Sequence, residues 1–284
     1  MIRRNLCFIL AATVSAMAFW MPLRALVGFS FHSAYSAYSY IPVIPLISAC
    51  LIYLEKKRIF REIHNGFGPG AALLVLAVVL LGFGKKYSGV LSENDFLSLM
   101  ILSLVMLWTG TFLLFYGVQA FRAAAFPVLF LLLMVPIPEF LYGRTVLFLQ
   151  NGSVLAASAI FKAVGVPTLQ QGVRFSLPGI DVDVAEQCCG IRSCLALFIT
   201  GLLMGHIFFH SLWSKFSLCV VVIAVTIFKN GLRIVTLSLL TLHPEFTSFT
   251  GTLHRYGGIP FSLLGLVLLA PVVWSLRQLE TIQK

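Results

Sequence analysis

Two adjacent cysteines, Cys188 and Cys189, stand where a polar segment meets an apolar run that begins near Gly190. A thiol at the start of a helix is exposed to the positive end of the helix dipole, which favours the thiolate, and Arg192 adds positive charge. Because the thiolate is the nucleophilic form of cysteine, this pattern is suited to covalent catalysis, with Glu186 as a polar neighbour. Two non-catalytic alternatives are that both cysteines are inert packing residues or that they form a vicinal disulfide.

A second polar group, formed by Lys229, Asn230 and Arg233, interrupts a long apolar run. An arginine near the centre of a membrane span costs about 2.5–3.5 kcal/mol even on lenient insertion scales. Asn230 and Arg233 are three residues apart, so they share one face of a helix. An isolated arginine at this position would be explained if its own side chain extended to a lipid phosphate. The neighbouring Asn230 and Lys229 favour a polar cavity instead.

His254 precedes the last apolar run and is the side chain type best suited to move protons near neutral pH. The topology inferred below brings Cys188, Arg233 and His254 to one side of the membrane at one depth. We therefore expect Cys188 to attack a peptide carbonyl and Arg233 to supply hydrogen-bond donors to the oxyanion. His254 would protonate the leaving amine and later activate an acceptor.

The composition requires that these residues be positioned by a membrane domain. Hydrophobic residues make up 59% of the 284 residues and charged residues 11%, whereas a soluble domain carries about 25% charge. The net charge of +10 comes mostly from residues between apolar runs, so membrane lipid is the expected partner and nucleic acid is not. We predict one integral membrane domain over 1–284, with four N-terminal spans in 1–118 and a catalytic core in 119–284.

Eight apolar runs approach the length of about 20 residues that crosses a bilayer. They are 6–23, 37–54, 69–84, 96–117, 126–140, 190–209, 213–240 and 259–276. The fold class predicted is therefore an all-α polytopic membrane protein with about eight transmembrane helices. The segment 144–164 is more polar, and we expect an interfacial or shallow re-entrant helix there.

The segment 168–185 alternates apolar and polar residues and is broken by Pro178 and Gly179, which is typical of a short β-hairpin. Its apolar positions are Val173, Phe175, Leu177, Ile180, Val182 and Val184. The edges of a hairpin would be unpaired in hydrocarbon, so it must lie in the aqueous layer. The basic cluster at 56–61 favours the cytoplasm for its own side, and most acidic residues fall on the other side. This orientation makes the hairpin extracytoplasmic and places the site at the periplasmic face of a cell inner membrane.

Three motifs in this order resemble those of the exosortases and archaeosortases, which are membrane cysteine transpeptidases. The motifs are Ala-Glu-Gln-Cys-Cys-Gly-Ile-Arg-Ser at 185–193, Asn-Gly-Leu-Arg at 230–233 and His-Arg-Tyr-Gly at 254–257, and the prolines at 127, 136 and 138 and the Gly-Val-Pro segment at 165–167 are also similar. The resemblance covers roughly the last 160 residues. It implies that Cys188 is the nucleophile, although Cys189 stands where family members often have serine, and this leaves the choice between the two open.

The resemblance also implies the substrates. They would be secreted proteins with a C-terminal sorting tail, in which a Pro-Glu-Pro-like (PEP-CTERM-like) motif precedes a transmembrane span and a basic end. The enzyme would cleave the tail and transfer the protein to an acceptor, with no cofactor and no metal.

Two other classes of protein are considered from the residues. A membrane transporter or channel for an anionic solute would line its path with Lys229, Arg233 and Arg192, and it would need no cysteine. A metal site would use Cys188, Cys189, Cys194 and His254, but adjacent cysteines are poorly placed to bind one ion.

Overall fold

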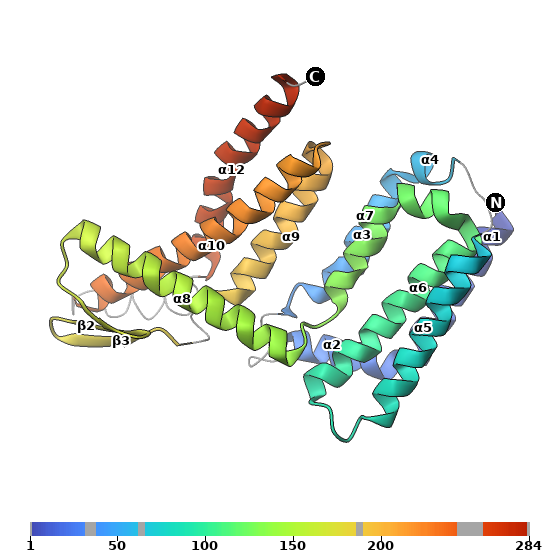
Figure 1. Ribbon diagram of the computed structural model, residues 1–284, viewed down its shortest axis with the longest axis horizontal. Helices are drawn as coiled ribbons and strands as arrows, with labels where there is room; N and C mark the ends of the chain where they lie inside the picture. The colour runs from blue at the N-terminus through green and yellow to red at the C-terminus, as the bar shows by residue number, and fades with distance from the viewer. Residues whose placement is uncertain (1, 32–37, 62–65, 186–189, 243–257, 283–284) are drawn as a thin grey trace. The chain divides into compact units, whose positions relative to one another are not determined.

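The computed structural model describes residues 2–31, 38–61, 66–185, 190–242 and 258–282. The chain divides into two compact units, Met1–Tyr142 and Gly143–Lys284. Six helices in the described part are long and apolar enough to cross a membrane, and a seventh span results if one sharply bent pair of helices is counted. The helices and the small sheet can be followed along the chain in Figure 1.

The first unit contains a bent helix pair, several short helices and one long helical hairpin. Its elements are α1 (Ile2–Ala18), α2 (Trp20–Phe31), η2 (Ile41–Val43), α3 (Ile44–Leu54), α4 (Lys56–Ile59), α5 (Phe67–Lys86), α6 (Glu93–Ala123), α7 (Ala125–Phe130) and η3 (Leu131–Met134). The helices α5 and α6 pack along their length. The hydroxyl of Ser92 accepts a hydrogen bond from the backbone N–H of Asp95, which caps the start of α6.

Five of the eight predicted spans are confirmed as long apolar helices, namely those at 69–84, 96–117, 190–209, 213–240 and 259–276. The other three differ from a simple span. The run 6–23 falls on α1 and α2, whose axes differ by 71°, while the runs 37–54 and 126–140 contain only the shorter apolar helices Ile41–Leu54 and Ala125–Met134. Prolines explain the last case: Val135 is extended before Pro136, and proline disfavours a helical residue before it.

The helix α8 (Glu139–Val164) is longer than the interfacial segment that we predicted at 144–164. With 26 residues it is long and apolar enough to be a candidate membrane span. The polar residues that suggested an interfacial position are Arg144, Gln150, Asn151 and Lys162, and of these only Gln150 is buried and hydrogen-bonded within the protein. The other three are exposed.

Three further helices, α9 (Ile191–Phe208), α10 (Leu212–Thr241) and α12 (Gly258–Ile282), pack against one another in the second unit. Leu197, Leu218, Val222 and Leu269 are fully buried where they meet. The carboxylate of Glu280 accepts hydrogen bonds from the backbone N–H groups of His210 (3.1 Å) and Ser211 (2.9 Å), which links the end of α12 to the turn before α10.

The predicted hairpin at 168–185 is a three-stranded antiparallel sheet with the order β1-β2-β3. Its strands are β1 (Leu169–Gln171), β2 (Arg174–Leu177) and β3 (Ile180–Asp183). The alternation identified the paired strands correctly, but β1 was missed because Leu-Gln-Gln carries no alternating pattern. Arg174 and Asp183 face each other across β2 and β3 and form a salt bridge with distances of 2.9 and 3.0 Å.

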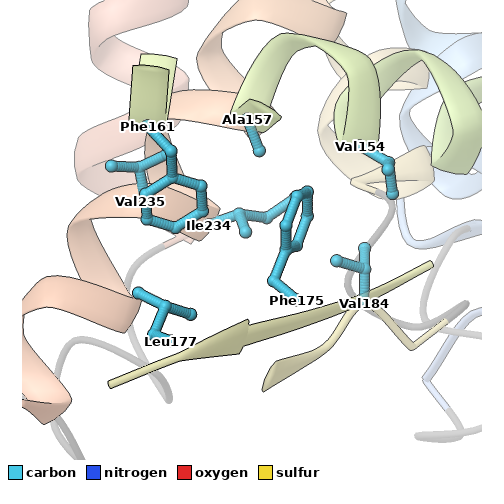
Figure 2. Close-up of a cluster of buried hydrophobic side chains, with 8 residues drawn as sticks. All are labelled: Val154, Ala157, Phe161, Phe175, Leu177, Val184, Ile234 and Val235. Carbon is cyan, nitrogen blue, oxygen red and sulfur yellow. The ribbon is translucent and has the colours of Figure 1, made fainter. Parts of the chain in front are cut away.

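The sheet is anchored to α8 and α10 by a cluster of buried apolar side chains. Figure 2 shows them converging from the three elements, with Phe175 fully buried among them. The members are Val154, Ala157 and Phe161 from α8, Phe175, Leu177 and Val184 from the sheet and its end, and Ile234 and Val235 from α10. Because Ile234 directly follows Arg233, this cluster fixes the part of α10 that carries the predicted guanidinium.

Candidate functional site

One face of α10 carries three polar residues in the middle of an apolar helix. Lys229 and Asn230 are each only 2% exposed, and Arg233 is half-buried. Lys229 and Arg233 are four residues apart, and Asn230 and Arg233 are three apart, so all three side chains lie on neighbouring positions of one helix surface. Lys229 and Asn230 are therefore turned toward the protein interior, while the polar cavity itself stays a prediction.

Asn230 connects this face to α8. Its side-chain amide donates a hydrogen bond to the hydroxyl of Ser153 at 3.0 Å, and that hydroxyl donates to the carbonyl of Leu149 at 2.7 Å. The two helices are close enough for this because Gly231 faces α8: a β-carbon at position 231 would lie 2.6 Å from Cβ of Ala156 and 2.9 Å from the backbone nitrogen of Ala157. A small-residue contact thus sets the distance between α8 and the polar face.

Lys229 connects the same face to the start of α9. Its ammonium donates a hydrogen bond to the hydroxyl of Ser193 at 2.6 Å, and this hydroxyl donates to the carbonyl of Gly190 at 2.9 Å. Gly190 directly follows Cys189 in the chain. The polar face of α10 therefore holds the turn that comes immediately after the two adjacent cysteines.

The turn at Gly190 needs glycine for two reasons. Its φ is +75°, a left-handed conformation that side chains disfavour. In addition, a β-carbon there would lie 2.9 Å from Oδ1 of Asn230 and 3.3 Å from Oγ of Ser193. The turn and the polar side chains around it are therefore packed together without room for a methyl group.

Replacement of Gly190 by Ala is expected to damage the site more than the fold. The strained φ costs on the order of 1–2 kcal/mol, and the added methyl group displaces the amide of Asn230. We expect at least a tenfold loss of activity with protein accumulation reduced by less than half. The measurement is the rate at which the substrate is converted, normalised to the amount of protein. Gly143→Ala is the matched control, because a β-carbon at 143 meets no atom within 4 Å and its φ is not in the left-handed region.

A second anchor lies on the other side of the cysteines. The side-chain amide of Gln150 in α8 donates a 2.6 Å hydrogen bond to the carbonyl of Val184, just after β3. Val184 is also joined to the sheet, since its N–H donates to the carbonyl of Val173. The polypeptide is thus held at 184, before the cysteines, and again at 190, after them.

The predicted site residues fall into two groups. Cys188, Cys189, Glu186 and His254 lie outside the described residues. Arg233 and Asn230 lie on the inward face of α10, whereas Arg192 is exposed on the first turn of α9. Ser153, Ser193 and Gln150 were not predicted, because single serines and glutamines in apolar helices carry no recognisable signal. Three of the four residues of the rival metal site are likewise outside the described part, so this site stays untested.

The described part of the site is rich in donors and poor in negative charge. The salt bridges among the described residues are Arg58–Glu55 and Arg174–Asp183, so neither Lys229 nor Arg233 has a carboxylate partner there. Arg233 also makes no hydrogen bond to the described residues. Among the described residues, none occupies its five N–H donors, and a guanidinium is suited to binding an anion or to stabilising one that develops during a reaction.

These features indicate a multi-pass membrane protein in which buried polar residues of α10 contact the turn that follows a pair of cysteines in the sequence. The chain belongs to the transmembrane exosortase family, whose model it matches over residues 33–271. This match confirms the resemblance seen in the three motifs and extends it into the N-terminal unit. Neither the comparison with curated proteins nor that with solved structures gave a match.

Proposed function

We propose that the protein is a cysteine transpeptidase that cleaves C-terminal sorting tails from secreted proteins and transfers these proteins to an acceptor. The observation that carries the proposal is the contact between the polar face of α10 and the Gly190 turn. It joins two of the motifs on which the family resemblance rests, the one that contains the cysteines and the one that contains Asn230 and Arg233.

In the proposed reaction, the thiolate of Cys188 attacks the carbonyl carbon of the scissile peptide bond. The carbonyl oxygen becomes an oxyanion, and the guanidinium of Arg233 donates hydrogen bonds to it. The carbon–nitrogen bond then breaks, His254 gives a proton to the departing amine of the tail, and a thioester remains on Cys188.

The second half of the reaction returns the enzyme to its starting state. An acceptor nucleophile loses a proton to His254 and attacks the thioester carbon. The second oxyanion collapses, and the thiolate of Cys188 leaves. Water as the acceptor would give hydrolysis, so transfer requires that the acceptor compete with water for the thioester.

The topology supports a substrate that is itself anchored in the membrane. A tail with its own span would lie beside the helices of the enzyme and hold its motif at the level of the sheet. The sheet must be outside hydrocarbon, and we place it, with the site, on the periplasmic face of the cell inner membrane. Glu186, Cys189, Arg192 and Asn230 would support or bind the motif.

The test is co-expression with a secreted reporter that ends in a Pro-Glu-Pro-type motif, an apolar span and a basic end. The expected result is a shortened reporter whose new C-terminus lies within the motif, identified by mass spectrometry. A reporter with the motif scrambled and the span unchanged is the control, and it should stay uncleaved.

The rival class, a transporter for an anionic solute, predicts a different result. Reconstituted protein would then move an anion across vesicles, and replacement of both Cys188 and Cys189 by Ala would leave this movement intact. Anion movement together with an intact reporter would contradict the proposed transpeptidase.

A further inference from the structure

A cluster of positive charge lies in the first unit, where α4 meets the last turn of α6, and the proposed reaction has no use for it. Its five basic residues are all exposed, and they are Lys56, Lys57, Arg58, Arg61 and Arg122. Like charges that are brought together repel one another, and the field of such a surface attracts anions. The cluster is therefore stabilised when an anion binds to it.

Packing within the first unit fixes the backbone that carries this cluster. Ile59 of α4 is 1% exposed, and the ring of Phe60 lies 4.8 Å from that of Tyr116 of α6, centroid to centroid. Nη2 of Arg58 also donates a hydrogen bond of 2.8 Å to the carbonyl of Ala123, the last residue of α6. The carbonyl end of a helix carries partial negative charge, so a cation is favourable there. The basic side chains thus project from a surface of defined shape.

A pocket of about 150 Å³ opens at this surface, lined by Arg58, Ile59, Arg61, Gln119 and Ala123. One water needs about 10–15 Å³ of such space, so the pocket has room for a group of several non-hydrogen atoms. Arg61 and Gln119 make no hydrogen bond or ion pair to the described residues. Guanidinium and amide groups donate hydrogen bonds, and the fork of a guanidinium matches the oxygens of a phosphate.

The acidic residues near the cluster are too few to neutralise it. Glu55 is the described carboxylate there, and it pairs with Arg58. Glu62 comes next in the sequence and lies outside the described residues, but with both acids counted the segment 55–62 still has four basic and two acidic residues. Arg122 adds a further positive charge from α6. The compensating anion must therefore come largely from outside this part of the chain.

The surface beside the cluster is apolar and exposed, which favours a lipid over a soluble anion. Tyr53 and Leu54 at the end of α3 are 67% and 70% exposed, and the ammonium of Lys56 lies 3.9 Å from the centroid of the Tyr53 ring. A tyrosine beside a lysine at the end of an apolar helix is typical of the membrane–water interface.

We propose that the pocket lined by Arg58, Arg61 and Gln119 binds the phosphate of an anionic phospholipid, whose acyl chains run along the exposed apolar side chains. Each basic residue near an anionic lipid surface strengthens the attraction about fivefold, so two of them contribute about tenfold to thirtyfold. The inference does not rest on the proposed function, because it concerns residues of the first unit alone.

The experiment is native mass spectrometry of the full-length protein in a neutral detergent, titrated with phosphatidylglycerol or with phosphatidylcholine, which has no net charge. We expect phosphatidylglycerol to bind at concentrations lower by about tenfold or more. The double variant Arg61→Gln with Arg122→Gln should bind phosphatidylglycerol about tenfold to thirtyfold more weakly. Neither arginine is bonded to the described residues, so the melting temperature should stay unchanged. Arg61→Gln alone should weaken binding about fivefold, so the test also stands on a single change.

The matched control is Lys85→Gln with Lys86→Gln, which removes two exposed charges from the last turn of α5. These lysines lie at the other end of the hairpin of α5 and α6, since Gly84 meets Met100 whereas Gly66 meets Gly117. The control should keep the wild-type affinity to within about twofold, because the effect of an exposed charge fades over about 10 Å in salt.

Three results would overturn the proposal: equal affinity for the two lipids, wild-type affinity in the arginine variants, or an equal loss in the lysine control. Inorganic phosphate provides a further test of the source of the anion. If phosphate displaced phosphatidylglycerol at an equal concentration, the pocket would be a site for free phosphate and the assignment to a lipid would be wrong. We expect phosphate to displace the lipid only at a large excess, because it lacks acyl chains.

Discussion

Replacement of Cys188 by Ala is expected to abolish tail cleavage, with a fall in rate on the order of 10³-fold or more. Without the nucleophile, only substrate binding and oxyanion stabilisation still accelerate the reaction. Other covalent enzymes that lose their nucleophile are slowed by at least this factor. The thioester cannot form, so neither hydrolysis nor transfer products should appear. The measurement is a pulse–chase of the tailed reporter, with the enzyme level determined in the same membranes.

Cys189→Ala is the matched comparison, because it changes the adjacent thiol. The proposal assigns the attack on the substrate to Cys188 alone, so loss of the neighbouring thiol removes no reacting group. We expect Cys189→Ala to slow cleavage by less than tenfold. Cleavage that survives Cys188→Ala but is lost in Cys189→Ala would move the nucleophile by one residue.

Replacement of Arg233 by Ala should lower the rate of cleavage by roughly 10²–10³-fold, the effect of removing an oxyanion donor. In the structure Arg233 is half-buried and makes no hydrogen bond or ion pair to the described residues. Its loss should therefore leave the fold intact, since the apolar cluster beginning at Ile234 holds this part of α10. The thiol should remain reactive toward a maleimide, which separates this effect from loss of the nucleophile.

Arg233→Lys tests whether the planar guanidinium matters or only its charge. Lysine places one compact charge and lacks the fork of donors, so we expect partial activity between those of the wild type and Arg233→Ala. Full activity of the Ala variant, with the protein present at its normal level, would remove Arg233 from the chemistry and leave it a lipid-facing anchor.

Much of the second unit could be predicted from the sequence, because its signals are strong and local. Three apolar runs and the alternating segment after 168 each matched an element of this unit, and Phe175 and Leu177, two apolar positions of that segment, are buried. The spacing of Asn230 and Arg233 placed both on one helix face, which the structure turns inward. Periodicity is sufficient for such inferences because it depends only on backbone geometry.

The failures arose where tertiary contacts decide the outcome. The polarity of 144–164 led us to expect an interfacial helix, but it did not predict that Gln150 is buried and bonded to the carbonyl of Val184. The runs 37–54 and 126–140 have enough apolar residues for spans, but prolines limit the helical segments within them. Ser193 and Ser153 matter because they form hydrogen bonds with Lys229 and Asn230. A single sequence carries no pattern that predicts such pairs.

The crossing of α8 and α10 has a consequence for how this site tolerates change. At Gly231 the nearest obstacles to a larger residue are Cβ of Ala156 and the backbone of Ala157, and no rotamer change can move them aside. A larger residue at position 231 would push the two helices apart and lengthen the hydrogen bond between Asn230 and Ser153. The spacing of the two helices at the polar face is therefore set by a position that has no side chain of its own, and inhibitory substitutions should cluster there without touching substrate.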